Sequence, residues 1–339
     1  MSIIANYIKI ILLYPFAFVY GCVTFVRNKL FDFGIWDSYL PSVPTIGVGN
    51  LAVGGTGKTP FILFLVEQLL KNGYTVAVLS RGYGRNTKGM LTVEKDSLPI
   101  QVGDEPLLIK QKFEKITVIV SEKRINAVKF LENQKVDFIL LDDNFQHRYV
   151  KTHFQFLLTR QDKFFFNDYV LPAGMLREHK SGVKRADAVI ITNSYLTNIN
   201  LSSIKKINQY KNLPIYFSQP KMMIDVSYSQ DTFAIAVAGI AYPLPFISFV
   251  ASKFSVYQLF QYKDHYNYTL NDLENWLAIA EQQLNVQKKY VIVCTEKDWV
   301  KISRILMPKV QLKINFAVVK LEIEFNDTSF IFDIIKLKN

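Results

Sequence analysis

The segment Gly54-Gly-Thr-Gly-Lys-Thr59 has the composition and spacing of a phosphate-binding loop. Its glycines leave backbone N–H groups free to surround phosphate oxygens, and the start of the following helix adds more. In such a loop Lys58 reaches the β- and γ-phosphates, and the Thr59 hydroxyl ligates Mg²⁺. The general pattern has Gly where this chain has Ala52, the smallest replacement. We therefore expect a nucleoside triphosphate with Mg²⁺ to bind Gly54, Gly55, Thr56, Gly57, Lys58 and Thr59.

Two adjacent carboxylates, Asp142 and Asp143, follow the apolar run Phe138-Ile-Leu-Leu141. P-loop enzymes hold Mg²⁺ or its water shell with an acid at the end of a neighbouring strand. A strand that ends in Asp is common, so the upstream P-loop is what favours a metal-binding role. The residue types leave open which of the two lies nearer the metal. His147 is either a hydrogen-bonded surface histidine or a contact of the same site.

Two further loops carry arginines and carboxylates. Ser80-Arg-Gly-Tyr-Gly-Arg85 follows the second expected strand, and residues just past the carboxyl ends of parallel strands line the ligand crevice. Arg81 and Arg85 either clamp an anionic group or form a solvated basic turn. Asp104, beside Glu105, is either the N-cap of a helix or a base that faces the site.

Three more charged stretches have the composition of ordinary loops. They are Leu171-Pro-Ala-Gly-Met-Leu-Arg177-Glu178, Asp264-His265-Tyr266 and Thr295-Glu-Lys-Asp298. The last lacks the Asn-Lys-x-Asp pattern that recognises guanine, so ATP is the expected nucleotide. The role of Thr295–Asp298 is otherwise open.

The elements that must position these residues follow a strand–helix–strand pattern. A strand at 45–49 leads into the P-loop, a helix is expected at 60–71, and the next strand at 74–79. This unit predicts an α/β fold with a parallel sheet covered by helices on both faces. Near-continuous apolar runs predict further doubly buried strands, at 116–120, 138–141, 154–158 and 188–191.

A second, smaller α/β unit is expected beyond Asn212-Leu-Pro214. Strands at 233–238 and 289–294 flank a helix at about 270–284. The expected organisation is a membrane-associated segment at 1–34, a P-loop NTPase-type core at 35–216 and a smaller α/β domain at 217–339.

The N-terminal segment 10–26 is uncharged and about long enough, at the lower limit, to span a bilayer. Pro15 and Gly21 interrupt it, so a helix lying in the membrane interface is preferred to a transmembrane span, and burial against the chain's own core comes third. Arg27 and Lys29 suit anionic headgroups. A loose match to a lipoprotein cleavage site is rejected, because export would separate the P-loop from ATP.

The composition describes a folded, basic protein. The chain has 339 residues and a formal net charge of +11, which predicts attraction to an acidic partner such as a membrane surface or a phosphorylated substrate. Its basic residues form no dense run, and it lacks the aromatic platforms of a strand-binding groove, so no nucleic-acid partner is expected. Cys22 and Cys294 are too few and too distant for a disulfide framework.

Taken in chain order, seven motifs resemble the tetraacyldisaccharide 4′-kinases of lipid A biosynthesis. The resemblance runs from the apolar segment to about residue 300, through Gly49-Asn-Leu-Ala-Val-Gly-Gly-Thr-Gly-Lys-Thr-Pro60, Ser80-Arg-Gly-Tyr-Gly-Arg85, Gly103-Asp-Glu-Pro106, Asp142-Asp-Asn-Phe-Gln-His-Arg148, Leu171-Pro-Ala-Gly-Met-Leu-Arg-Glu178, Asp264-His265 and Thr295-Glu-Lys-Asp298. This sequence departs from the family pattern at Asn144, where Gly is usual, at Met175 in place of Pro, and at Tyr266 in place of a second His.

The resemblance implies a kinase that uses MgATP to phosphorylate the 4′-hydroxyl of a tetraacylated glucosamine disaccharide 1-phosphate. It also implies a P-loop core, a smaller C-terminal domain and an N-terminal membrane-binding helix, at the cytoplasmic face of the inner membrane of Gram-negative bacteria. By resemblance, Asp104 takes the hydroxyl proton with His265 beside it, and Lys58 acts on the phosphates. No obligate protein partner is expected. The candidates for substrate or anion binding are Arg81, Arg85, Arg124, His147, Arg177 and Glu178.

The alternative interpretation is a P-loop switch or partition-type ATPase that acts on a protein partner. Such proteins share the loop, the paired aspartates and a basic surface. They need neither His265 nor a lipid-facing apolar segment.

Overall fold

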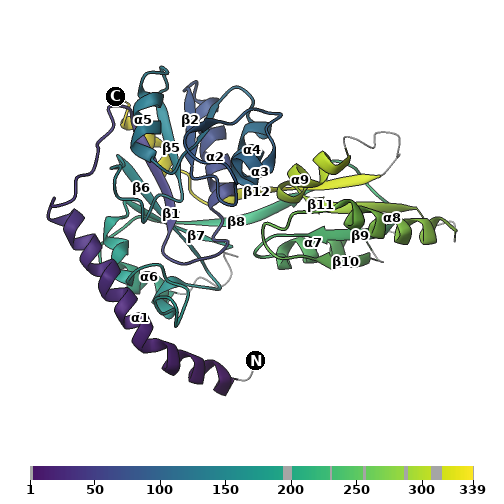
Figure 1. The fold of residues 1–339 in the computed structure, drawn as a ribbon, viewed down its shortest axis with the longest axis horizontal. Helices are drawn as coiled ribbons and strands as arrows, with labels where there is room; N and C mark the ends of the chain where they lie inside the picture. The colour runs from purple at the N-terminus through teal and green to yellow at the C-terminus, as the bar shows by residue number, and fades with distance from the viewer. Residues whose placement is uncertain are drawn as a thin grey trace.

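The computed structural model describes residues 3–193, 201–229, 231–254, 257–285, 289–306 and 315–338. One continuous sheet joins the strands of these ranges. Figure 1 shows two lobes side by side, with the P-loop lobe on the left and the C-terminal lobe on the right. The prediction of a P-loop-type α/β core with a smaller α/β unit is confirmed.

The P-loop lobe holds seven neighbouring strands, parallel except for the last pair. In spatial order they are β7 (Ala188–Thr192), β6 (Phe154–Arg160), β1 (Thr45–Asn50), β5 (Phe138–Asp142), β2 (Val76–Ser80), β4 (Thr117–Val120) and β3 (Leu91–Thr92). The helices of this lobe are α2 (Lys58–Lys71), α3 (Pro99–Val102), α4 (Asp104–Lys112), α5 (Arg124–Glu132) and α6 (Leu201–Asn208), with 3₁₀ turns η1 (Phe165–Asn167) and η2 (Lys180–Arg185).

Alternate residues of β2 explain why its sequence is apolar from Val76 to Leu79. Val76 and Val78 pack in the cluster that contains α2 and α4, whereas Ala77 and Leu79 pack against α5 on the other face. A strand covered on both sides has no position left for a polar residue. The predicted strands of this lobe are therefore present, with only small differences at their ends.

The C-terminal lobe repeats this layered arrangement on a smaller scale. It consists of β10 (Tyr257–Gln261), β9 (Phe233–Ala238) and β11 (Tyr290–Thr295), with α8 (Leu270–Asn285) and α9 (Glu296–Leu306) against one face and α7 (Leu244–Lys253) against the other. Phe233, Ile235 and Val237 pack on the side of α8, and the intervening alanines pack on α7.

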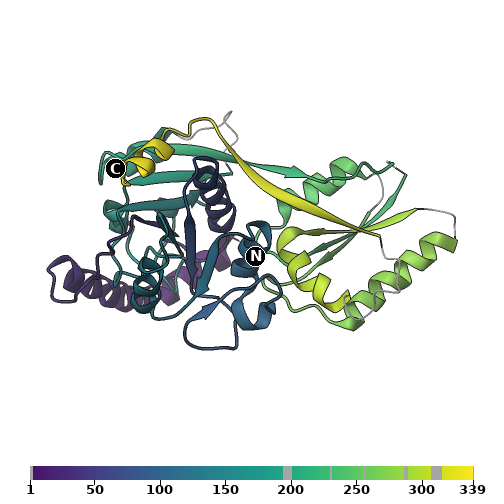
Figure 2. The same cartoon turned by 90° about the horizontal axis from the view of Figure 1, so that it is seen from above.

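Two long antiparallel strands, β8 (Ile215–Met223) and β12 (Phe316–Phe325), run between the lobes, as Figure 2 shows. After β12 the chain continues into α10 (Phe330–Lys336), whose fully buried Phe330 contacts the rings of Phe61 and Tyr216 in the P-loop lobe. The expected domain at 217–339 is corrected accordingly, because the last residues complete the core of the first lobe.

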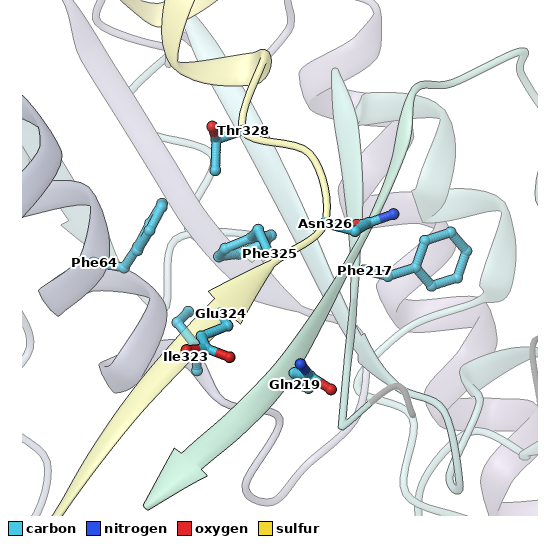
Figure 3. Close-up of a pocket in the computed structure, with 8 residues that line it drawn as sticks. All are labelled: Phe64, Phe217, Gln219, Ile323, Glu324, Phe325, Asn326 and Thr328. Atoms are coloured by element: carbon cyan, nitrogen blue, oxygen red, sulfur yellow. The ribbon is translucent and has the colours of Figure 1, made fainter. Parts of the chain in front are cut away.

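A groove of about 440 Å³ lies beside this crossing of β8 and β12 and is drawn in Figure 3. It is lined by Phe64, Phe217, Gln219, Ile323, Glu324, Phe325, Asn326 and Thr328. None of the predicted site residues lines it.

The N-terminal helix α1 (Ile3–Asp32) runs along the outside of the P-loop lobe (Figure 1). It continues through Pro15 and Gly21, so the expected interruption is wrong; a helix of this length tolerates the loss of one backbone hydrogen bond. From Ile10 onward it is long and apolar enough to cross a membrane, and only 11% of its apolar window is buried. Burial against the protein's own core is therefore excluded for this window.

Candidate active site

The P-loop connects the carboxyl end of β1 to the first turn of α2. Gly54 and Gly57 have φ values of 111° and 84°, in the left-handed region that favours glycine. A Cβ on Gly55 would lie 3.2 Å from the Cβ of Ala241, because the C-terminal lobe lies against the loop there. Both the conformation and the close approach thus account for the glycines of the motif.

Lys58 and Thr59 open α2, as the motif predicted. Lys58 Nζ lies 3.3 Å from Asn50 Oδ1 and 3.3 Å from a carboxylate oxygen of Asp143. Asn50 also donates to the buried Thr56 hydroxyl at 2.9 Å, which ties the loop to the end of β1. The loop is therefore held in shape by the protein's own contacts.

Asp142 lies at the end of β5, beside the P-loop strand, where it pairs in register with Val48 of β1. Its carboxylate is buried; Oδ2 accepts from Ser80 Oγ at 2.8 Å, and Oδ1 has no hydrogen-bond partner among the described residues. Burial, together with the nearby carboxylates of Glu105 and Asp143, raises the pKa of Asp142 to about 6. A buried, unsatisfied acceptor of this kind fits a bound cation.

Asp143 has a different environment, with a positive φ of 48°. It pairs with Lys58 and, at 2.8 Å, with Arg177. Burial raises the pKa of Asp143, but Lys58 and Arg177 outweigh it and bring the pKa to about 2. Among the residues that the structure describes, no cluster of three or more metal-ligating side chains exists. A Mg²⁺ ion at Asp142 would therefore need phosphate oxygens as ligands, which is usual for Mg²⁺ in nucleotide sites.

Asp104 and His265 come from different lobes and meet. His265 lies in the loop after β10, with φ 60°, and its Nδ1 is 3.0 and 2.9 Å from the two carboxylate oxygens of Asp104. Asp104 is the first residue of α4, whose N-cap is Gly103 with no side-chain cap. The alternative that Asp104 is a capping residue is therefore wrong.

The electrostatics of this pair favour an ionised carboxylate. Burial raises the pKa of Asp104, but the hydrogen bond from His265 and the charges of Lys297 and Lys301 hold it well below its usual range. The same hydrogen bond raises the pKa of His265, although burial and Lys297 oppose it.

Lys297 and Lys301, one turn apart on α9, were not among the predicted site residues. Lys297 Nζ lies 3.1 Å from Glu105 Oε1, and the buried Lys301 Nζ lies 3.4 Å from Asp104 Oδ2. Lys297 belongs to a motif whose role was open, and nothing in the local pattern signals either lysine, since their partners are remote in sequence.

The same motif also has a structural part. Asp298 is fully buried and accepts hydrogen bonds from the Gly239 amide at 3.2 Å, the Tyr268 hydroxyl at 2.9 Å and the Thr295 hydroxyl at 2.7 Å. It therefore fixes the start of α9, and with it Lys297, relative to the rest of the lobe.

Besides Arg177, which pairs with Asp143, three of the predicted substrate or anion contacts are bonded within the protein. The guanidinium of Arg85 is buried against Glu122 at 2.6 Å. Arg124 is buried and donates to Asn144 Oδ1 at 2.7 Å and to the Asp142 carbonyl at 2.6 Å. Their expected role as substrate contacts is corrected, because both guanidinium groups are buried and hold loops. Arg85 Nη2 donates to Glu122 and to the Gly89 carbonyl, whereas its Nε and Nη1 are buried with no partner among the described residues. Asn144, which departs from the family pattern, is itself a partner of Arg124.

Glu178 is the third corrected candidate. It is buried and accepts from Asn28 of α1 at 2.6 Å, from Gln146 at 3.0 Å and from Arg185 at 2.7 Å. Together with the 2.7 Å bond from Arg27 to the Gln146 carbonyl, these contacts tie the C-terminal end of α1 to the loop that follows Asp143.

Arg81 and His147 differ from each other in exposure. Arg81 is exposed in the loop after β2, and its charge, like that of Arg124, contributes to a lower pKa of His147. Burial is the main cause of this shift to about 4, so the imidazole is neutral at physiological pH. His147 Nδ1 is buried and has no hydrogen-bond partner within the part of the chain that the structure describes.

A second hollow of about 460 Å³ opens on the C-terminal lobe, beside the loop that carries His265. It is lined by Ile240, Ala241, Pro243, Gln261, Tyr262, Lys263 and Asp264. Since Ala241 also approaches Gly55, this hollow borders the P-loop.

Comparison with known proteins agrees with this geometry. The family model for Tetraacyldisaccharide-1-P 4′-kinase matches residues 9–337. A tetraacyldisaccharide 4′-kinase from Cytophaga hutchinsonii is 37% identical over 314 residues, covering 88% of this chain and 87% of that protein. One from Flavobacterium psychrophilum is 38% identical over 307 residues, covering 86% and 87%.

A solved structure extends the agreement to the fold. The crystal structure of LpxK from Aquifex aeolicus in complex with ATP matches with a TM-score of 0.73 and 25% sequence identity, over 96% of this chain and 98% of that one. The resemblance drawn from the seven motifs is thereby confirmed, and the chain belongs to the tetraacyldisaccharide-1-phosphate 4′-kinase family.

Proposed function

We propose that the chain transfers the γ-phosphate of ATP to the 4′-hydroxyl of a tetraacylated glucosamine disaccharide 1-phosphate, with Asp104 as the base. Family membership supports the reaction and both substrates. The observation that supports the base is the contact between Asp104 and His265, at 2.9 Å, across the two lobes. A P-loop switch or partition-type ATPase, the alternative function, would have no use for this contact.

On the nucleotide side, the loop amides and Lys58 hold the β- and γ-phosphates, as in other P-loop proteins. Thr59 and Asp142 hold Mg²⁺, which neutralises charge on the phosphates when it is bound. The free, buried Oδ1 of Asp142 supports this choice between the two aspartates. Asp143 orients Lys58 and Arg177, since it pairs with both.

On the acceptor side, Asp104 takes the proton of the 4′-hydroxyl as its oxygen bonds to the γ-phosphorus. The bond between that phosphorus and the bridging oxygen breaks, and its electron pair leaves with ADP. A carboxylate is suited to this role because it is ionised at physiological pH and lies where both lobes meet. Water is excluded when the lobes are in contact, which limits wasteful ATP hydrolysis.

Kinetics with the purified acylated disaccharide 1-phosphate and labelled ATP test this function. Lys58→Ala should remove activity while the fold is retained. Asp104→Ala and His265→Ala should each lower kcat strongly. If both leave kcat within about threefold of wild type, which is a loss under about 1 kcal/mol, the assignment of the base is refuted. Label released only as free phosphate would favour the switch.

We further propose that α1 attaches the protein to the cytoplasmic face of the inner membrane, lying in the interface. Its exposed apolar side chains, among them Leu12, Phe16 and Val23, support contact with lipid. Lys29 is 46% exposed and contacts the similarly accessible Asp32 on the same helix at 3.5 Å, so its ammonium can also meet headgroups. Arg27 is instead bonded to the Gln146 carbonyl.

Vesicle flotation tests the membrane proposal. Replacing Leu12, Phe16 and Val23 together by Glu keeps the contacts at the end of α1 and should release the protein from anionic vesicles. Val226→Glu, at a similarly exposed apolar residue outside α1, is the matched control and should leave binding unchanged. Unchanged binding of the triple variant would contradict the proposal.

A further inference from the structure

The ammonium group of Lys297 makes three contacts in the interface between the lobes. Its Nζ lies 3.1 Å from Glu105 Oε1, 3.2 Å from Asp264 Oδ1 and 3.3 Å from His265 Nε2. An ammonium group has three N–H donors and no acceptor, so these three partners use all of its hydrogens. Nε2 of His265 must therefore accept the hydrogen bond from Lys297.

The other ring nitrogen fixes the rest of the proton arrangement. Nδ1 of His265 faces both carboxylate oxygens of Asp104, at 3.0 and 2.9 Å, so it must carry a hydrogen. If Nε2 also carried one, an imidazolium N–H would point at an ammonium group 3.3 Å away. The geometry is consistent with a neutral imidazole that donates through Nδ1 and accepts through Nε2.

We propose that Lys297 is a positioning residue for the phosphoryl transfer: by donating to Nε2 it favours the neutral tautomer of His265 that donates a hydrogen bond to Asp104 through Nδ1. This inference rests on the proposed role of Asp104 as the base. It also distinguishes the two members of the pair. Nε2 of His265 already accepts from Lys297, so Asp104 is the group that takes the proton of the substrate hydroxyl.

The charged and titratable groups around His265 decide the direction of the effect. Asp104 and Glu105 face it from α4, Asp264 precedes it, Lys297 and Lys301 face it from α9, and the ring of Tyr83 lies 5.1 Å away. The hydrogen bond to Asp104 raises the pKa of His265 above its ordinary value, and burial and the Lys297 ammonium oppose this rise.

Without the Lys297 ammonium, the pKa of His265 should therefore rise. The ring would be an imidazolium at neutral pH, and an imidazolium beside Asp104 makes that carboxylate a weaker base.

The test compares Lys297→Met with wild type by two measurements. The first is ¹⁵N NMR of the full-length protein labelled at its histidines, with the His265 signals assigned from His265→Asn. At a mildly alkaline pH of about 8, wild type should show a protonated Nδ1 and an unprotonated Nε2, whereas the variant should still show both nitrogens protonated. Lys253→Met, which removes an exposed charge from α7 of the same lobe, should resemble wild type.

The second measurement is the pH dependence of kcat. The variant should lose about tenfold or more at neutral pH and recover as the pH rises and His265 deprotonates. Lys297→Arg, which retains the charge and donors, should recover part of the activity at neutral pH. A loss that is independent of pH would indicate a merely structural role and would overturn the proposal.

The outcomes separate this inference from the proposed function. At about pH 8, a wild-type His265 with hydrogen on Nε2 overturns the inference without any variant, and so does a His265 that is neutral in Lys297→Met. If Asp104→Asn retains wild-type kcat, the assignment of the base fails, while the NMR result still decides whether Lys297 controls His265.

Discussion

Replacing Asp104 by Asn should destabilise the protein as well as inactivate it. The carboxylate is 6% exposed and faces the ammonium of Lys301, which is 7% exposed, at 3.4 Å. Removing the carboxylate charge takes away the ion-pair partner of this buried ammonium and leaves it the more distant Asp298 carboxylate and the ring of Tyr268, at 5.6 Å, as weaker partners.

The size of this destabilisation follows from the burial of the ion pair between Asp104 and Lys301. Breaking a buried ion pair by removing one partner costs about 3–5 kcal/mol. The long distance and the remaining contact with Tyr268 place this pair at the lower end, so we expect Asp104→Asn to cost about 3 kcal/mol near neutral pH. Adding Lys301→Met, which removes the stranded charge, should restore about 2 kcal/mol of that loss.

The stability difference between wild type and Asp104→Asn should depend on pH in a definite direction. The pKa of Asp104 is lower in the folded protein than in the unfolded chain, so its stabilising contribution is present above the unfolded value and is lost as the pH falls. The difference in stability between wild type and Asp104→Asn should therefore narrow below about pH 4.

Urea unfolding followed by circular dichroism measures these differences. Glu105→Gln is the matched control: Glu105 pairs with Lys297 but is 25% exposed, so its loss should cost under about 1 kcal/mol. The reasoning is refuted if Asp104→Asn is as stable as wild type, or if the double variant is no more stable than the single one.

Three further predictions test other parts of the structure. Phe330→Ala should cost about 3–5 kcal/mol in urea unfolding, because it removes a fully buried ring that joins α10 to the P-loop lobe; a small cost would mean that α10 is not part of this core. A maleimide should label the exposed Cys22 rapidly and leave Cys294 unlabelled, because burial raises the pKa of the Cys294 thiol. Anionic vesicles should protect Cys22 from the reagent. Equal labelling of Cys22 with and without vesicles would contradict the lipid contact of α1. Asp142→Asn should abolish Mg²⁺-dependent activity yet leave the unliganded protein at least as stable as wild type at about pH 8. The pKa of Asp142 is about 6 in the folded protein and about 4 in the unfolded chain, so wild type loses stability as the pH rises between these two values and does not regain it above them. Lower stability of the variant in thermal unfolding would contradict this.

The local parts of the site could be predicted from sequence because they depend on neighbouring residues. Gly54 to Thr59 form one turn between a strand and a helix, and Asp142 and Asp143 directly follow a buried strand. The sequence did not show which of the two aspartates keeps an unpaired carboxylate oxygen. That depends on contacts from other segments: Ser80 bonds to Asp142, and Lys58 and Arg177 pair with Asp143.

The predicted substrate contacts that were wrong share one cause. Arg85, Arg124 and Glu178 have the side chains of substrate contacts, but each is buried on a partner from another segment. A residue type shows what a side chain can bind, and only its surroundings show what it does bind.

By itself, the sequence determined the family, the nucleotide loop and the doubly covered strands, because glycine spacing and apolar periodicity act over a few residues. Only the tertiary structure decided that Asp104 meets His265, separated by 161 positions, and that Lys297 completes the group. It also decided that α10 returns to the first lobe. These contacts depend on the order of strands in one sheet that joins both lobes, and no local pattern carries that order.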